Sequence, residues 1–255
     1  MFFNKSGSRN IGLKDQICLI KMFKIVDKPA TIDIKACFDV MLDVFLQKGH
    51  DAFEIMGDSA TGEPIFFKKL NPFYKAIRKQ DVACFSAYFD ESFDLGIHYW
   101  DMPLNPESES DKKRFVDFFL AIPYEWYSLD QAKAIVTKID AVIGLCYGYV
   151  NFVPCNYCID REEAWVARED DKPPSRDLSL EELKIEFEER AERSNAIVDE
   201  MKAQKREMFR HVNVGQIPKH YPVNFYNSRQ LEHVIEPTER FEKISNNLTL
   251  VTNAI

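Results

Sequence analysis

The chain has 255 residues, of which 45% are hydrophobic and 13% aromatic, enough to bury the core of one large domain. It carries 33 basic and 41 acidic residues, a net charge of −8, and a surface of that sign repels phosphate backbones. We therefore expect no nucleic-acid partner. A basic protein is the better candidate partner, and acidity that serves only solubility is the alternative explanation.

The apolar runs of the sequence are too short to cross a membrane. Charged residues also interrupt the first apolar stretch, MFFNKSGSRNIGLKDQICLIKMFKIVDK, and no small-residue cleavage site follows it. We therefore expect a cytoplasmic protein that has no membrane partner and whose six cysteines are reduced.

Hydrophobic periodicity predicts the first elements. Residues 15–26 alternate as a strand does, and TIDIKACFDVMLDVFLQKGH has the spacing of an amphipathic helix that Thr31 caps and Gly49 ends. The segment GDSATGEP predicts a turn between short strands. Its glycines have phosphate-loop spacing, but Glu63-Pro64 stands where such a loop needs lysine and a hydroxyl residue.

The middle of the chain predicts further helices and strands. A short helix is expected over 71–81, followed by strands over 82–89, 93–100 and 114–122. Ser128 and Gln131 then form a capping box in front of a helix that Gly148 can end, and YVNFV resumes an extended chain. Strand, helix and strand in this order predict a crossover that packs the helix on a sheet.

The second half of the chain is more polar. Residues 160–178 predict a loop, and SLEELKIEFEERAERSNAIVDEMKAQKREMFRHV predicts a long charged helix over 179–211 with a narrow apolar stripe. Such a helix docks on another surface, pairs with a second copy, or is simply solvated. A strand in YPVNFYN, a short helix capped by Ser228 and a strand in NLTLVTNAI complete the chain.

These elements together predict an α+β protein. We expect a mixed, mainly antiparallel sheet flanked by helices. Residues 1–255 would form one domain, with 160–212 inserted as a charged loop plus a long helix.

Cys155 and Cys158 form a CxxC pair, which is half of a zinc or redox motif. A structural zinc needs four ligands, and neither a second such pair nor a paired histidine motif accompanies this one. A redox pair belongs at the start of a helix, whereas this pair follows a predicted strand. We therefore expect no metal and no cofactor.

His98 is the histidine that lies within a predicted core strand. Asp94 and Asp101 are close to it in sequence, and with Cys84 they suggest a Cys–His–Asp hydrolase. No nucleophile elbow or glycine-rich oxyanion turn accompanies them, so we expect no catalytic residue. A small cytoplasmic hydrolase or transferase that uses His98 and nearby acids is the alternative function.

Aromatic and acidic residues gather around the ends of two predicted strands. HYWDMP and IPYEWYS contribute the rings, and the polar loop between them contributes acids. Aromatic residues at an acidic rim are typical of a protein-binding hot spot, and rings that merely pack the sheet ends are the other interpretation. The predicted partner-binding residues are Trp100, Asp101, Glu107, Glu109, Asp111, Tyr124, Glu125 and Trp126.

The order of the segments resembles a family of type VI secretion immunity proteins, domains of unknown function encoded beside type VI toxins. IKACFDVMLDVFLQKG is similar to the family's opening helix, and KKLNPFYKAIRK to its short proline-bearing helix. FVDFFLAIPYEWYS and the helix and strand after it resemble the central signature of the family, and IPKHYPVNFYNSRQLEHV its late strand and helix. Phe225 departs from the family pattern, which has tryptophan there.

The resemblance implies a non-catalytic immunity protein. Such a protein binds its cognate toxin and occludes the toxin's active site, and here an acidic, aromatic-rimmed surface would meet a basic face. A homodimeric scaffold built through the long helix is a further alternative.

Overall fold

The structure is a computed structural model that describes residues 16–26, 32–51, 53–89, 95–103, 113–154, 196, 203, 215–216, 221–234 and 239–253. The strands are β1 (Gln16–Val26), β2 (Glu54–Asp58), β3 (Pro64–Phe67), β4 (Cys84–Tyr88), β5 (Gly96–Pro103), β6 (Arg114–Pro123), β7 (Tyr147–Pro154), β8 (Val223–Tyr226), β9 (Glu239–Lys243) and β10 (Thr249–Asn253). The helices are α1 (Ile34–Gln47), α2 (Leu70–Arg78), the 3₁₀ turn η2 (Tyr124–Trp126), α3 (Leu129–Ile143) and α5 (Ser228–Leu231).

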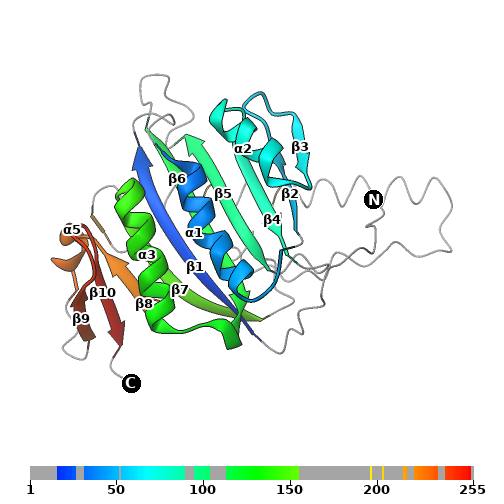
Figure 1. The fold of residues 1–255 in the computed structure, drawn as a ribbon. Coiled ribbons are helices and arrows are strands. Elements are labelled where there is room, and N and C mark those ends of the chain that lie inside the picture. The colour runs from blue at the N-terminus through cyan, green and yellow to red at the C-terminus, as the bar shows by residue number, and fades with distance from the viewer. Residues whose placement is uncertain are drawn as a thin grey trace, which may run out of the picture.

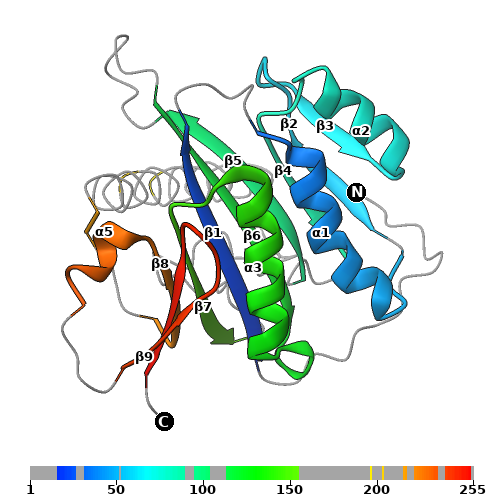
Figure 2. The ribbon, with the colours of Figure 1, turned by 60° about the vertical axis from the view of Figure 1, so that its left-hand side comes forward.

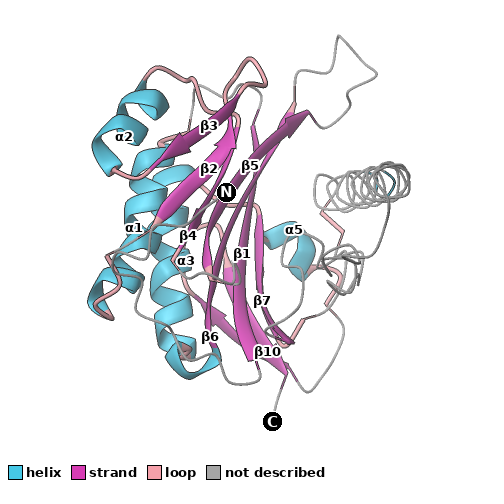
Figure 3. Ribbon diagram, turned by 90° about the vertical axis from the view of Figure 1, so that its right-hand side faces the viewer, coloured by secondary structure: helices cyan, strands magenta, loops and turns pink. Residues whose placement is uncertain are grey.

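The described strands form a single ten-stranded sheet in the order β3-β2-β4-β5-β6-β1-β7-β8-β10-β9 (Figure 1). Every neighbouring pair is antiparallel. Viewed along its edge, the sheet has α1, α2 and α3 on one side and the short α5 on the other (Figure 3).

The prediction of a mixed sheet flanked by helices is therefore wrong. Sequence periodicity predicts strands but contains no information on which strands become neighbours, and pairing decides whether a sheet is mixed. The predicted insertion over 160–212, including the long helix, lies outside the described residues apart from positions 196 and 203, which are helical.

The predicted strand–helix–strand crossover is confirmed, but its two strands are not neighbours in the sheet, because another strand lies between them. We call this arrangement a split crossover. β6 and β7 run in the same direction because each pairs antiparallel with β1, which lies between them. α3 joins them and packs over this part of the sheet (Figure 2). The same arrangement occurs twice more. Helix α2 connects β3 to β4, which lie on either side of β2, and α5 connects β8 to β9, which lie on either side of β10. The crossovers through α2, α3 and α5 each leave room for one antiparallel strand, whereas α1 connects β1 to β2 across β6, β5 and β4.

The core lies on both faces of the sheet. β1 is buried along most of its length, which explains its nearly continuous apolar sequence. On the face covered by α1, the ring of Phe38 lies 5.1 Å from Phe73 and 5.6 Å from Phe85, measured between centroids. On the opposite face, Phe23 stacks on Tyr147 at 5.6 Å within a separate aromatic cluster.

Several predicted helix boundaries need correction. The cap of α1 is Asp33, whose Oδ1 accepts from the Ala36 N–H at 3.0 Å, rather than Thr31. α3 ends at Gly144, which has φ +64°, rather than at Gly148. Gly148 lies in β7, where a Cβ would stand 2.9 Å from the Lys21 carbonyl oxygen. Asn227 rather than Ser228 caps α5.

The edge strand β9 is an element that the sequence did not predict. Its sequence, ERFEK, is almost entirely charged, so it lacks the apolar alternation of a half-buried strand. Charged side chains are common on edge strands because they discourage pairing with other chains.

Candidate functional site

The predicted partner-binding residues fall at two ends of the sheet. The β5–β6 register pairs Gly96 with Ala121 and Pro103 with Arg114, so the end of β5 lies far from η2, which follows β6. β6 has 10 residues, and a strand of that length extends about 30 Å. The structure therefore does not bring Trp100 and Asp101 together with Tyr124, Glu125 and Trp126. Glu107, Glu109 and Asp111 lie outside the described residues.

Trp100 and Asp101 also point to opposite faces of the sheet. Trp100 packs against the aromatic cluster that contains Phe23 and Phe115. Asp101 lies on the helix-covered face, where its Oδ1 accepts from Arg114 Nε at 2.6 Å. Neighbours in sequence alternate between faces along a strand, so the two residues cannot belong to one patch.

The other predicted group surrounds η2. The ring of Trp126 lies 5.8 Å from Phe45 and 5.2 Å from His50, so part of it packs against the end of α1. Tyr124 is 48% exposed, with its ring edge against Phe152 at 5.4 Å. Glu125 is exposed beside it. This turn presents one exposed ring and one acid to solvent.

A cleft of about 590 Å³ opens at the Asp101 end of the sheet. It lies where the start of α1 faces the end of α2, above β5. Its lining residues are Ile32, Asp33, Ile34, Lys35, Ile77, Arg78, Gln80, Val82, Tyr99 and Asp101.

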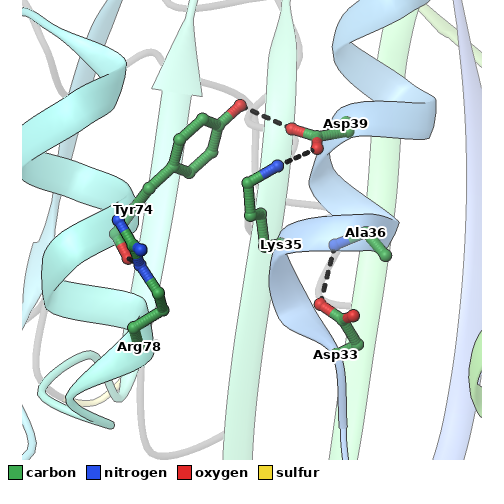
Figure 4. Close-up of polar contacts among 6 residues, drawn as sticks. All are labelled: Asp33, Lys35, Ala36, Asp39, Tyr74 and Arg78. Atoms are coloured by element: carbon green, nitrogen blue, oxygen red, sulfur yellow. Dashed lines mark hydrogen bonds and ion pairs between the residues drawn. The ribbon is translucent and has the colours of Figure 1, made fainter.

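Polar contacts between α1 and α2 fix one side of this cleft (Figure 4). Tyr74 donates its hydroxyl hydrogen to Asp39 Oδ1 at 2.5 Å, and Lys35 pairs with the other carboxylate oxygen of Asp39. Burial, and then the hydrogen bond to Asp39, raise the pKa of Tyr74, so the phenol stays protonated as the donor. Arg78 Nε donates to the Tyr74 carbonyl at 3.3 Å, so α2 holds its own arginine beside the opening.

The floor of the cleft is formed by Tyr99 and Asp101, two residues apart on β5. Tyr99 is only 3% exposed, and its ring lies 5.4 Å from Phe85 and 5.0 Å from Phe118. Burial raises the pKa of Tyr99, with Asp101 adding to the shift. Burial also raises the pKa of the Asp101 carboxyl, against the opposing effect of Arg114. The floor is therefore a poorly solvated place where charge is costly.

Two polar atoms on this floor make no hydrogen bond with the described part of the chain. They are the hydroxyl of Tyr99 and the Oδ2 atom of Asp101, whose Oδ1 is taken by Arg114. Sequence patterns point to Asp101 as a site residue but not to Tyr99. The sequence could have indicated Tyr99, because residues two positions apart on a strand lie on the same face and Tyr99 is two positions before Asp101.

A row of buried polar residues crosses the opposite face of the sheet. Lys21, His98, Asp117 and Asn224 are all buried there. The His98 ring stacks on Phe119 at 4.0 Å, and its Nδ1 lies 2.7 Å from Ser86 Oγ. Of these four residues only His98 was predicted as a candidate, although a lysine or aspartate inside an apolar strand is also a detectable signal.

The structure does not assemble the Cys84–His98–Asp101 arrangement. Asp101 lies on the face opposite His98, and Cys84 Sγ donates to Asp58 Oδ2 at 3.4 Å. Asp94 lies outside the described residues. Elsewhere, burial and then Asp33 raise the pKa of the Cys37 thiol to about 12, which disfavours the reactive thiolate.

The CxxC pair Cys155 and Cys158 also lies outside the described residues. Within the described ranges, no three His, Cys, Asp or Glu side chains come together as a metal site. No helix in these ranges has the length and apolar character needed to cross a membrane.

Comparisons with known proteins give one distant likeness. No protein-family model matches the chain, and no curated protein matches it. Among solved structures it is similar to the Pseudomonas aeruginosa T6SS protein PA0821, with a TM-score of 0.47 and 12% identity over 98% of this chain and 68% of that one. The likeness is to a type VI secretion protein, and it is too distant to carry a conclusion about the function of this chain.

Proposed function

We propose that this chain is an immunity protein that binds a cognate type VI secretion toxin and occludes the toxin's active site, without catalysis of its own. The observation that carries the proposal is the Asp101 end of the sheet. An open cleft lined by the buried Asp101 carboxylate lies there, and the bound toxin would cover the rim of this cleft.

The acidic loop strengthens this choice of surface. Residues 104–112 connect Pro103 to Lys113, and Pro103 is paired with Arg114 at the same end of the sheet as Asp101. Glu107, Glu109 and Asp111 lie in the sequence between Pro103 and Lys113. Acids at the margin of an interface speed the encounter with a basic partner more than they strengthen the final complex.

The segments that resemble the immunity family supply the middle of the fold. FVDFFLAIPYEWYS forms β6 and η2, and the helix and strand after it are α3 and β7. They build the split crossover around β1, so the resemblance rests on elements that define this sheet. The exposed turn at Tyr124 and Trp126 is proposed as a second contact for a partner that extends along the sheet.

The test is to co-express this protein with the product of the neighbouring gene, which the proposal expects to be the toxin. Cells that carry the toxin should survive with this protein, and the two proteins should copurify in a fixed ratio. His98→Ala should still protect, because the proposed mechanism uses no catalytic histidine. A His98→Ala protein that copurifies with the toxin but no longer protects would favour the hydrolase or transferase instead.

A further inference from the structure

The cleft floor presents a hydrogen-bond donor and an acceptor from the same strand. Tyr99 and Asp101 are two positions apart on β5 and so lie on one face, about 7 Å apart along the strand. The protonated Tyr99 hydroxyl can donate, and Asp101 Oδ2 can only accept while the carboxylate is ionised. A ligand that satisfies both atoms must carry both an acceptor and a donor.

The charges around the cleft balance. Asp33 and Asp101 line it together with Lys35 and Arg78, two acids against two bases. A cationic ligand on the floor would meet the guanidinium of Arg114, which already occupies Asp101. An anionic ligand would meet the Asp101 carboxylate itself. A neutral polar ligand avoids both conflicts.

The remaining walls suit the apolar part of such a ligand. They are formed by Ile32, Ile34, Ile77 and Val82. Binding sites for small ligands are concave and mostly apolar, have a few convergent polar groups, and measure about 300–1,000 Å³. The cleft, at about 590 Å³, falls within that range.

We propose that this cleft is a binding site for a neutral carboxamide group. The amide oxygen accepts from the Tyr99 hydroxyl, and an amide N–H donates to Asp101 Oδ2. A carboxamide carries both an acceptor and a donor, which the pair on the floor requires. The site does not depend on the proposed toxin, since the pocket is formed within this chain alone.

The experiment titrates the ¹⁵N-labelled protein with three probes of similar size, which are propionamide, propylammonium and propionate. Propionamide should shift the backbone signals of Ile34, Ile77 and Val82 saturably, in the millimolar range expected for so small a ligand. The two charged probes should leave these signals unchanged at matched ionic strength. Equal responses to all three probes, or no response to propionamide, would overturn the proposal.

Two conservative variants locate the contact. Tyr99→Phe removes only the hydroxyl and keeps the ring between Phe85 and Phe118, so amide binding should weaken about fivefold to tenfold. Tyr127→Phe removes a hydroxyl next to η2, away from the cleft, and should bind as the wild type does. Unchanged affinity in Tyr99→Phe would show that the amide does not use this hydroxyl.

N-methylacetamide identifies the source of the amide. It mimics a peptide backbone, whereas propionamide mimics an asparagine or glutamine side chain or a small primary amide. Preference for propionamide would indicate a side chain or small molecule, and preference for N-methylacetamide an extended peptide segment. Either preference supports carboxamide recognition.

Discussion

Gln80 shows how one residue at the cleft is held in an unfavourable backbone conformation. Its φ of +57° lies in the left-handed region, which costs a residue with a side chain about 1–2 kcal/mol. The Gln80 N–H donates to the Ile77 carbonyl at 2.9 Å and the Asp81 N–H to the Ala76 carbonyl at 3.1 Å, closing α2 as a Schellman motif. Glycine usually occupies this position at the end of a helix. This chain has Gln80 there instead, and Gln80 lines the cleft.

We predict that Gln80→Gly raises the free energy of unfolding by about 1 kcal/mol, because glycine adopts positive φ without strain. Urea denaturation measures the change. Gly144→Ala is the matched control at φ +64° and should lower stability by about as much, since it adds a Cβ where Gln80→Gly removes one. A Gln80→Gly protein less stable than the wild type would mean that the glutamine side chain makes a stabilising contact larger than its strain.

Among the helices, α1 is held in place by the side chains of one face, which pack against α2 and β4. Phe38 packs between Phe73 of α2 and Phe85 of β4, with centroid distances of 5.1 and 5.6 Å. Leu46 lies on the same helix but is 46% exposed. Both are apolar residues of one helix, and of the two only Phe38 belongs to the core.

We predict that Phe38→Ala destabilises the protein by about 3–5 kcal/mol, because it leaves a cavity between two helices and the sheet. Leu46→Ala on the same helix should change stability by less than about 0.5 kcal/mol. Thermal and urea unfolding of both variants measure the difference. Equal costs for the two substitutions would mean that α1 does not pack against α2 and β4 as described.

At the scale of the whole molecule, the sheet keeps two candidate contact surfaces apart. Asp101 and the Tyr124–Trp126 turn lie about 30 Å from each other, at opposite ends of β6. An interface of standard size buries about 800 Å² on each partner, which corresponds to roughly 30 Å across. One partner therefore reaches both ends only if it lies along the sheet.

We predict different kinetic effects at the two ends. Neutralising Asp101, Glu107, Glu109 and Asp111 together should slow association with a basic partner and weaken its salt dependence. Trp126→Ala should instead speed dissociation, at a cost of about 2 kcal/mol if the ring anchors the partner. Surface plasmon resonance at two salt concentrations separates the rates.

Trp126→Phe is the control for the second variant, because Trp126 also packs on Phe45 within this chain. It should keep the internal packing, and melting of the free protein will show whether Trp126→Ala acts through folding. If neither rate changes in Trp126→Ala, the partner does not reach this end of the sheet.

Local sequence patterns were sufficient to predict which segments become helices and strands over most of the described chain. β1, α1, α2 and α3 were predicted because apolar spacing and capping residues are local properties. β9 was missed because an edge strand in water needs no apolar face. The end of α3 was misplaced because Gly144 and Gly148 are both plausible stops until Gly148 is seen pressed against β1.

Only the tertiary structure decided which strands are neighbours and which residues share a site. The cleft brings Asp33, Arg78 and Asp101 together from two helices and a strand, and no local pattern links positions so far apart in sequence. Strand alternation puts Trp100 and Asp101 on opposite faces, and the β5–β6 register separates both from Trp126. Periodicity determines to which face of its strand each residue points. Which other residues lie beside it on that face depends on strand order and register, and these are set by long-range packing.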